Sequence, residues 1–225
     1  MPSSISAADF ARGMTFDQYV AYVGTPENLR REYANGPRAD FSAFLRESFE
    51  NTHFTADQEA ALKWIVAQPG GPAKMLVVSE EWSSDCRREV PVFARIADVS
   101  GMELRIFLRD GDKYDVPASD PDVMAPFLNR KGSGAYRSIP VCAFYTADFE
   151  YLYHFTEYAA LYDKERVVVQ NIRAPKPGET PAETRARADR LFGELQRSPF
   201  WRIWASATVD EIVSALHRKL VLGVV

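Results

Sequence analysis

The stretch VSEEWSSDCRREVP, residues 78–91, carries the residue types in this chain that are best suited to thiol chemistry. Cys86 is one of two cysteines, and a thiol acts as a nucleophile only in its thiolate form. A short apolar strand is expected to end at Val78, and a helix is expected to begin just after Ser83. Cys86 would then lie in the first helical turn, where unpaired amide groups and the helix dipole lower a thiol pKa. Burial in apolar surroundings would raise that pKa instead, so the sequence makes Cys86 a candidate nucleophile and leaves its reactivity open.

The residues beside this cysteine would position the thiol and tune its pKa. Ser83 or Ser84 is expected to cap the helix, and a serine hydroxyl can also donate a hydrogen bond to a thiolate. Asp85 would stabilise the start of the helix and slightly raise the pKa of a neighbouring thiol. Arg87 and Arg88 would add positive charge if either side chain turned back toward the turn.

The second cysteine, Cys142, follows Pro140 by two residues, so the two side chains share a face if this segment is a strand. Cys142 is a candidate second thiol that could resolve a disulfide with Cys86, which requires Cα atoms within about 7 Å. The alternative is a small apolar strand residue. That alternative is favoured because free cysteines are among the most buried residues.

Metal, phosphate and cofactor chemistry find no support in the sequence. The three histidines, His53, His154 and His217, fall in different expected elements, and no spacing of His, Cys, Asp and Glu is typical of a metal site. The glycines of GSGAY, residues 132–136, lack the strand-to-helix context of a phosphate loop. We therefore predict no metal and no cofactor.

Composition bounds the class of protein. The chain has 225 residues, 46% of them hydrophobic and 26% charged, which is ordinary for a globular protein that buries a sizeable core. The net charge of −4 and the absence of a basic stripe argue against nucleic acid and anionic membranes as partners. The N-terminus lacks the pattern of a signal peptide, and no apolar stretch approaches the ~20 residues of a membrane span. Cytoplasmic residence is the expectation.

Hydrophobic periodicity and helix signals place the chemistry on an alternating series of elements. Capping-box patterns at Thr15 and Thr55 begin helices, and residues 1–54 are expected to be helical throughout. Pro91 should kink the helix that carries Cys86, because it removes a backbone donor. The later elements, in chain order, are expected to be a helix over 55–68, a strand over 74–79, a helix over 84–99, a strand over 103–109, a helix from Asp120 to near Gly132, and an antiparallel hairpin over 139–156.

The C-terminal third gives weaker signals. The run RVVVQNI, residues 166–172, is interpreted as an extra edge strand because of its β-branched residues. Thr180 and Pro181 begin a helix, and a second box from Thr208 to Glu211 is expected to begin another.

The central stretch resembles the thioredoxin superfamily over roughly residues 60 to 160. Thioredoxins have a tryptophan followed by Cys-x-x-Cys and then a proline. This chain has the same spacing, with Trp82, a four-residue turn that ends in Cys86, and Pro91 five residues later. SIPV, residues 138–141, corresponds to the family's cis-proline loop, with Pro140 as the proline. LRD (108–110) and RSIP (137–140) also resemble a bacterial subgroup whose motif is usually Trp-Cys-x-Asp-Cys-Arg.

The resemblance implies an α/β fold of the thioredoxin-like type. Its central mixed sheet of about four strands would be flanked by helices, with extra helices at both termini. Residues 1–54 would be an N-terminal helical extension, and residues 55–225 would be the thioredoxin-like domain with additional C-terminal helices.

One departure from the family decides which activities are open. The family's attacking cysteine corresponds to Ser83, and only the resolving position, Cys86, keeps its thiol. Thiol–disulfide exchange needs a thiolate to attack and a second thiol to release the mixed disulfide, so an ordinary dithiol cycle is not expected. A third alternative is that Ser83 is an engineered replacement for cysteine. The parent protein would then be a dithiol enzyme.

Two functions therefore remain from the sequence. The first is a thiol-based oxidoreductase with the single cysteine Cys86, assisted by Ser83, that acts on protein or small-molecule thiols and disulfides. The second is a redox-inactive module that binds a peptide or protein partner. The resemblance assigns partner contacts in either case to Trp82, Ser84, Asp85, Ile139 and Pro140.

A thiol peroxidase is a further alternative. Ser83-x-x-Cys86 matches the Thr/Ser-x-x-Cys spacing of peroxiredoxins. The proline that those enzymes carry four residues before the Thr/Ser is replaced here by Ser79.

Overall fold

A four-stranded mixed sheet forms the centre of the molecule in a computed structural model that describes residues 5–33, 36–110 and 121–223. Its strands lie in the order β4 (Glu103–Leu108), β3 (Lys74–Ser79), β7 (Val141–Tyr145), β8 (Tyr151–Thr156). β3 and β4 are parallel, and β3–β7 and β7–β8 are antiparallel. The predicted α/β architecture is confirmed, as are the four strand positions. β7 is buried along its length and β3 from Met75 onward, because helices cover both faces of the sheet.

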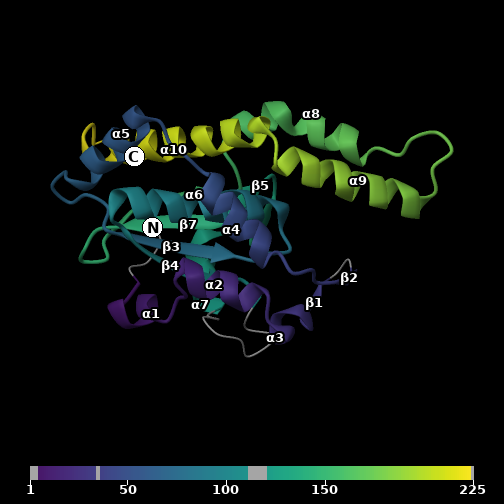
Figure 1. Ribbon diagram of the computed structural model, residues 1–225. Coiled ribbons are helices and arrows are strands. Elements are labelled where there is room, and N and C mark those ends of the chain that lie inside the picture. The colour runs from purple at the N-terminus through teal and green to yellow at the C-terminus, as the bar shows by residue number, and fades with distance from the viewer. Residues whose placement is uncertain (1–4, 34–35, 111–120, 224–225) are drawn as a thin grey trace.

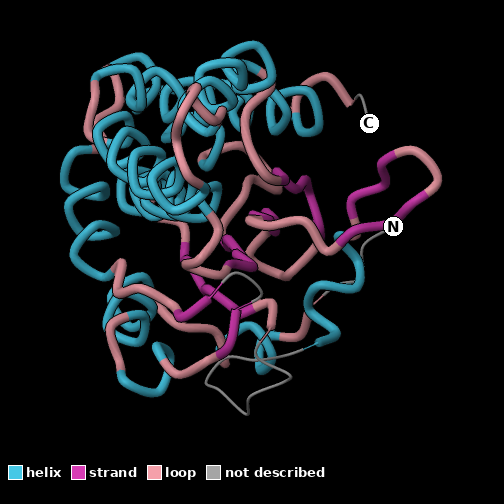
Figure 2. The backbone as a smooth tube through the Cα atoms, turned by 90° about the vertical axis from the view of Figure 1, so that its right-hand side faces the viewer, coloured by secondary structure: helices cyan, strands magenta, loops and turns pink. Residues whose placement is uncertain are grey.

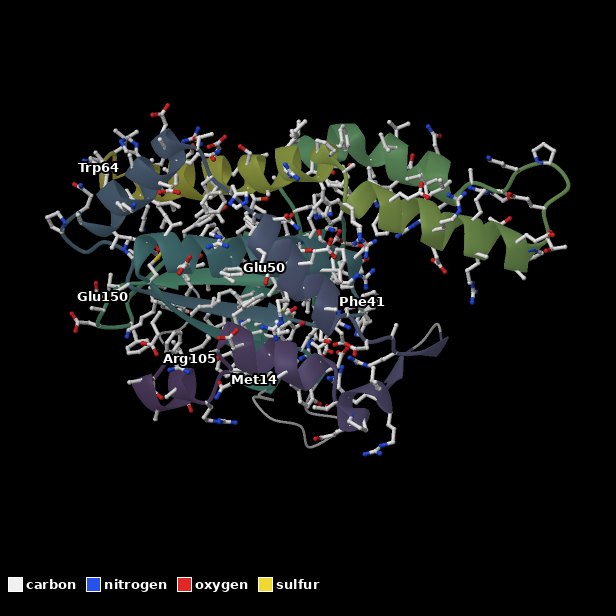
Figure 3. All side chains as sticks on the ribbon, viewed as in Figure 1. Met14, Phe41, Glu50, Trp64, Arg105 and Glu150 are labelled. Atoms are coloured by element: carbon white, nitrogen blue, oxygen red, sulfur yellow. The ribbon has the colours of Figure 1, made fainter. Side chains whose placement is uncertain are left out.

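Helices cover the two faces unequally. α6 (Ser84–Ser100) packs on one face, and α4 (Ser42–Asn51), α5 (Ala56–Val66) and α10 (Pro199–Leu220) pack against α6. α2 (Phe16–Val23) contacts β4 on the other face, and Met14 forms an isolated bridge with Ile106. Figure 1 shows this division, and Figure 2 shows most helices on one side of the strands. Met14 and Trp64, from these two groups, lie on opposite sides of the sheet (Figure 3).

The N-terminal region is mostly helical, as predicted, and shares the core of the sheet. Its remaining elements are α1 (Ala7–Ala11), α3 (Pro26–Leu29) and a short hairpin of β1 (Glu32–Tyr33) and β2 (Gly36–Pro37), which the sequence did not indicate. Phe10, Tyr19 and Leu45 belong to the same buried cluster as β3 and α6. The predicted capping boxes at Thr15 and Thr55 are both present.

The helix predicted from Asp120 to Gly132 is wrong beyond its first turns. α7 (Pro121–Met124) and a 3-10 helix (Ala125–Phe127) are followed by a hairpin of β5 (Asn129–Lys131) and β6 (Gly134–Tyr136). Gly132 has a φ of 59°, a left-handed conformation that suits a tight turn and that glycine adopts without strain. Asp120 itself lies outside the described residues.

The edge strand predicted at residues 166–172 is also wrong, because this segment lies within α8 (Leu161–Arg173). Tyr162 and Val169 are seven residues apart, which places both on one helix face, and both are buried. They form a small second core with Trp201 and Trp204 of α10. Packing against these aromatics outweighs the β-propensity of the valines.

The two C-terminal helix starts had different outcomes. α9 (Pro181–Gln196) begins at the predicted capping box of Thr180. Thr208 begins no helix, because α10 runs through it without a break. The Thr208 hydroxyl donates instead to the Glu89 carboxylate at 2.8 Å. α8 and α9 extend away from the sheet (Figure 1), and no residue of α9 is buried. Among the described residues, no helix combines the length and apolarity needed to cross a membrane.

Candidate functional site

The turn between β3 and α6 holds the residues singled out by the sequence. Ser83 is the N-cap of α6, and its Oγ accepts a hydrogen bond from the backbone N–H of Cys86 at 3.5 Å. Ser84 and Asp85 follow in the first helical turn, where both are half-buried. Pro91 lies inside the helix. The turn therefore places Cys86 where the sequence predicted it along the chain.

The thiol of Cys86 faces the core. Its side chain is 1% exposed, and it belongs to the main hydrophobic cluster. The backbone N–H of Glu80 donates to Sγ at 3.5 Å, which favours the thiolate only weakly against the loss of water. Burial raises the pKa of the Cys86 thiol to about 12. Of the two opposing effects that the sequence left open, burial therefore has the larger influence on this pKa.

Cys142 is likewise a buried, free thiol. It lies on β7 opposite Val77 and Phe155, and burial raises its pKa well above the ordinary value. The structure records Cys86 and Cys142 as two free cysteines and does not bring them together as a disulfide. Cys142 occupies the position of a small apolar strand residue, which is the interpretation that the sequence favoured.

Two arginines that the sequence reading did not single out as site residues join the turn to the loop before Pro140. The Arg109 guanidinium lies 4.9 Å from the centre of the Trp82 ring, a cation–π distance. Arg109 Nη1 donates to the Arg137 carbonyl at 3.1 Å, and Arg137 Nη2 donates to the Arg109 carbonyl at 2.9 Å. The Ile139–Pro140 peptide bond that follows is cis, and both residues are buried. Trp82 and this loop are thus held together through Arg109.

An open hollow of about 560 Å³ lies beside the turn, between α6 and α9; we name it the Trp82 hollow. Trp82, Ser83, Ser84 and Arg87 line one side. Arg173 and the α9 residues Pro181, Thr184, Arg185, Ala188 and Asp189 line the other. The sequence did not indicate the α9 side, because nothing in an isolated amphipathic helix shows which surface it will face.

Arg87 is the buried charge of this hollow. Its Nη1 donates to the carbonyls of Glu81 and Trp82, both at 2.9 Å, and its guanidinium stacks 3.9 Å from the Phe41 ring centre. Phe41 stands at the start of α4 (Figure 3). Arg87 is 9% exposed, and its Nε is buried without a hydrogen-bond partner among the described residues. Desolvation lowers the pKa of Arg87, and an anion in the hollow would oppose that shift.

A buried ionic network lies beneath the turn and was missed from the sequence, where residues 79–83 resemble an exposed turn. Glu80 and Glu81 are 0% and 1% exposed. Glu80 accepts from Arg31 Nη2 and Arg38 Nη1, each at 2.9 Å, and Arg38 Nη1 also donates to Glu81 at 2.6 Å. The N-terminal segment that carries these arginines therefore covers the turn.

No group of His, Cys, Asp and Glu among the described residues is arranged to hold a metal ion. Burial lowers the pKa of His154, whose Nδ1 lies 2.6 Å from the Tyr151 hydroxyl. His53 follows α4 and His217 lies on α10, so the three histidines are in separate elements.

Alkylation of Cys86 by iodoacetamide is expected to be at least about a hundredfold slower than that of free cysteine near neutral pH. A thiol with a pKa of about 12 holds far less thiolate than a free thiol of pKa about 8.5, and the reagent must also reach a buried atom. The rate should rise with pH, because deprotonation creates the reactive form. Mass spectrometry of the labelled peptides separates Cys86 from Cys142.

Unfolding in concentrated guanidinium chloride is the control, since both thiols should then react at the rate of free cysteine. Rapid labelling of Cys86 in the folded protein at about pH 6 would contradict the burial and revive an activated thiol.

Comparison with known proteins identifies the fold more firmly than the activity. A family model described as thioredoxin matches residues 42–169. A crystal structure of a protein of unknown function from Pseudomonas aeruginosa is similar over 96% of this chain and 99% of that one, at 14% identity and a TM-score of 0.53. An HIV epitope-scaffold is similar over 96% and 98% of the two chains, at 14% identity and a TM-score of 0.51. No curated protein gives a significant match to the sequence.

Proposed function

The chain belongs to the thioredoxin family, and from that premise we propose that it is a redox-inactive, thioredoxin-like module that binds a partner protein at the Trp82 turn. The observation that carries the proposal is the state of the two active-site positions. Ser83 stands where the resemblance to thioredoxins places the attacking thiol, and the remaining thiol, Cys86, is 1% exposed with a pKa raised to about 12. Neither side chain supplies an accessible thiolate at neutral pH.

The charges of the Trp82 hollow point to an acidic partner segment. Its lining has three guanidinium groups, from Arg87, Arg173 and Arg185, and one carboxylate, from Asp189. The N-terminus of the 17-residue helix α6 adds a positive dipole end at Ser83 and Ser84. The whole chain carries a net charge of −4, so this positive hollow is a local feature that would orient an acidic peptide.

The partner would contact two adjoining surfaces. One is the hollow itself, and the other is the ring of Trp82, which Arg109 ties to the loop of Ile139 and Pro140. Asp85 is engaged by Arg88 at 3.1 Å, so it contributes to the shape of the helix start rather than to a cation site. An oxidoreductase with Cys86 alone would require the thiol to become exposed, which the alkylation rate tests directly.

A synthetic peptide of alternating glutamate and alanine is expected to bind the protein, whereas a lysine–alanine peptide of equal length should not. Calorimetry should show an affinity for the acidic peptide that falls as salt is added, because exposed charges are screened. Arg185→Glu should weaken binding by at least about tenfold, since it places a like charge against the ligand. Arg185 is exposed, so the fold should survive the change.

Arg130→Glu, on the exposed surface of β5 and outside the hollow, is the matched control with the same change of net charge. If both substitutions weakened binding equally, the loss would come from the change in net charge and not from the hollow. Equal binding of the two peptides would refute the acidic partner.

A further inference from the structure

The three guanidinium groups of the Trp82 hollow have donors that no described residue uses. Arg173 and Arg185 make no hydrogen bond or ion pair with any described residue. Arg87 uses Nη1 for the two carbonyls named above, whereas its Nη2 donates to no described residue. Nε of Arg87 is fully buried but Nη2 is not, so Nη2 is the edge of this guanidinium that a ligand can reach. The hollow therefore presents unpaired cationic donors from α6 on one side and from α8 and α9 on the other.

Arg173 is held in place through its side chain and through its neighbours in the chain. Its guanidinium lies 5.4 Å from the centre of the Phe192 ring, a cation–π distance. The carbonyls of Ile172 and Ala174, on either side of it, accept from Arg187 Nη1 at 2.8 Å and Nη2 at 2.7 Å. Because this backbone is already ordered, an anion that binds Arg173 costs less conformational entropy than one that binds a mobile side chain.

The first turn of α6 adds neutral donors beside Arg87. The backbone N–H and the hydroxyl of Ser84 make no hydrogen bond to any described residue. Ser83 differs, because its hydroxyl already accepts from the Cys86 amide. Ser84 is half-buried and lines the hollow, so an anion with several oxygens could accept from its amide, its hydroxyl and a guanidinium together.

The charge of the lining matches a dianion better than it matches a single carboxylate. Three guanidinium groups are accompanied by one carboxylate, that of Asp189, which leaves a net charge of +2. A phosphate monoester carries about −1.5 to −2 near pH 7 and has three strong acceptor oxygens, whereas a glutamate side chain carries a single charge on two oxygens. Guanidinium groups also bind phosphate oxygens through paired N–H donors. A phosphoryl group therefore suits this lining better than a glutamate does.

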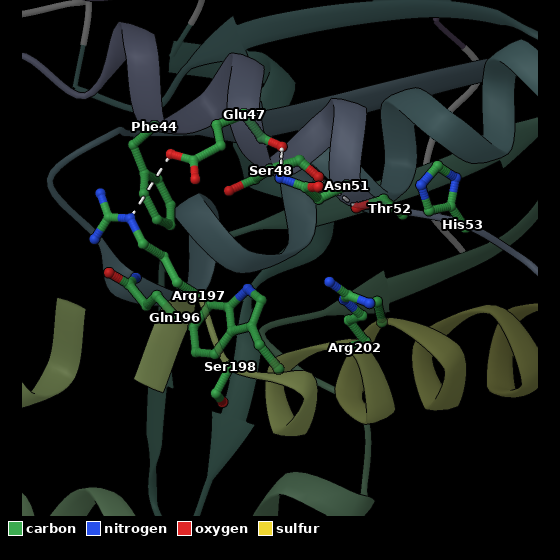
Figure 4. A pocket seen from close by; sticks show the side chains of 12 residues that line it. Phe44, Glu47, Ser48, Asn51, Thr52, His53, Gln196, Arg197, Ser198 and Arg202 are labelled. Carbon is green, nitrogen blue, oxygen red and sulfur yellow. Dashed lines mark hydrogen bonds and ion pairs between the residues drawn. The ribbon is translucent and has the colours of Figure 1, made fainter. Parts of the chain in front are cut away.

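The size of the hollow favours a phosphoryl group that is carried by a chain. The hollow has a volume of about 560 Å³. The cavity between α4 and the start of α10 in Figure 4 has a volume of about 90 Å³, which is room for about three water molecules. Arg197 in that cavity already has a counter-charge, since its Nε lies 3.7 Å from Glu47. Free phosphate would leave most of the Trp82 hollow unused, whereas a phosphorylated side chain and its flanking backbone would fill more of it.

We propose that the partner segment at the Trp82 hollow carries a phosphorylated serine or threonine, whose phosphoryl group binds Arg87, Arg173 and Ser84. This inference rests on the partner binding proposed above and names the group that the partner presents. Arg185, which is exposed near the start of α9, adds a third cation beside the phosphoryl group.

The test compares three peptides of alternating glutamate and alanine by calorimetry. The first has phosphoserine at its centre, the second has glutamate there, and the third has that glutamate and one more in place of a neighbouring alanine. The third peptide matches the net charge of the first and so controls for charge alone. We expect the phosphopeptide to bind at least about tenfold more tightly than either glutamate peptide, because only it places a dianion at one point.

Arg173→Gln and Arg185→Gln should each reduce the preference for the phosphopeptide over the charge-matched peptide by about fivefold or more. Arg130→Gln removes an exposed arginine outside the hollow and should leave that preference unchanged. A preference that survives both substitutions in the hollow would overturn the assignment of the phosphoryl group to this site.

The remaining outcomes separate this inference from the function on which it rests. Equal binding of the phosphopeptide and the charge-matched peptide would overturn the phosphoryl group and leave the acidic partner in place. Binding of none of the three peptides would overturn both proposals. Displacement of the phosphopeptide by an equal concentration of inorganic phosphate would identify free phosphate as the ligand and would overturn the phosphorylated segment.

Discussion

Glu80→Gln is expected to lower the free energy of unfolding by about 3–5 kcal/mol, which is a large part of the stability of an ordinary domain. The Glu80 carboxylate is fully buried and accepts three hydrogen bonds. Oε1 accepts from Arg31 Nη2 at 2.9 Å and from the Asp110 backbone N–H at 2.8 Å, and Oε2 accepts from Arg38 Nη1 at 2.9 Å.

The amide cannot replace the carboxylate in this position, although the two side chains have nearly the same shape. Glutamine offers one oxygen, so its NH₂ group must face a donor on the other side. The substitution also removes the negative charge that Glu80 places against Arg31, and breaking a buried ion pair costs far more than losing a surface pair. Arg38 keeps its ion pair with Glu81 at 2.6 Å, which limits the loss of stability.

Urea unfolding followed by circular dichroism measures the change, and Glu59→Gln is the matched control. Glu59 pairs with Lys63 at 3.4 Å on an exposed face of α5, so its loss should cost less than about 1 kcal/mol. Hydrogen exchange adds a local readout, because residues 38–42 should lose protection before the β3–β7 pairs do. A cost for Glu80→Gln no greater than that of the control would show that the network carries no net stability.

This network also explains which part of the site was predictable from the sequence. The strand, the turn and the helix around Cys86 follow from local patterns, because an apolar run, an N-cap serine and helical periodicity act over a few residues. The position of Cys86 in the first turn of that helix follows from the same local patterns. The burial of its thiol does not, since the segment that covers the turn is anchored by Arg31 and Arg38, more than forty residues earlier.

The same distinction separates the correct and incorrect helix predictions. The capping boxes predicted at Thr15, Thr55 and Thr180 are present in the structure, because the N-cap residue and its partner three positions later lie within one helical turn. Thr208 has a similar sequence context, yet its hydroxyl donates to Glu89, a residue 119 positions away, and the helix continues through it. The valines of α8 are another case, because only the aromatic side chains of α10 select the helical face that they bury.

Arg88→Met is the second substitution for which we expect a large effect, a loss of about 3–5 kcal/mol in the free energy of unfolding. Arg88 is 2% exposed, and its guanidinium is surrounded by aromatic rings. Its Cζ lies 4.5 Å from the Tyr162 ring centre and 5.5 Å from those of Trp201 and Trp204. Arg88 Nε also donates to the Glu89 carboxylate at 2.6 Å, so one side chain joins α6 to the second core of α8 and α10.

Methionine fills much of the same volume but leaves the Glu89 carboxylate buried, with the Thr208 hydroxyl as its one remaining hydrogen-bond partner among the described residues. Arg190→Met, which removes an exposed pair with Glu194 at 2.7 Å, is the control and should cost less than about 1 kcal/mol. The double variant Arg88→Met, Glu89→Gln should recover part of the loss, because it removes the stranded charge. Additive losses in the double variant would contradict a coupled pair.

The pH dependence of the Arg88→Met variant gives an independent check on the cause. Burial raises the pKa of Glu89, and Arg88 opposes that rise, so removing Arg88 should raise the pKa further. A carboxyl whose folded pKa lies above its unfolded value of about 4.3 adds stability at low pH that is lost as pH rises through the folded pKa. The gap between wild type and variant should therefore be smaller at about pH 5 than at about pH 8. A gap that does not change with pH would place the cost in the lost cation–π and packing contacts with the rings, and would mean that the aromatic cluster, rather than the ion pair, holds α10 against α6.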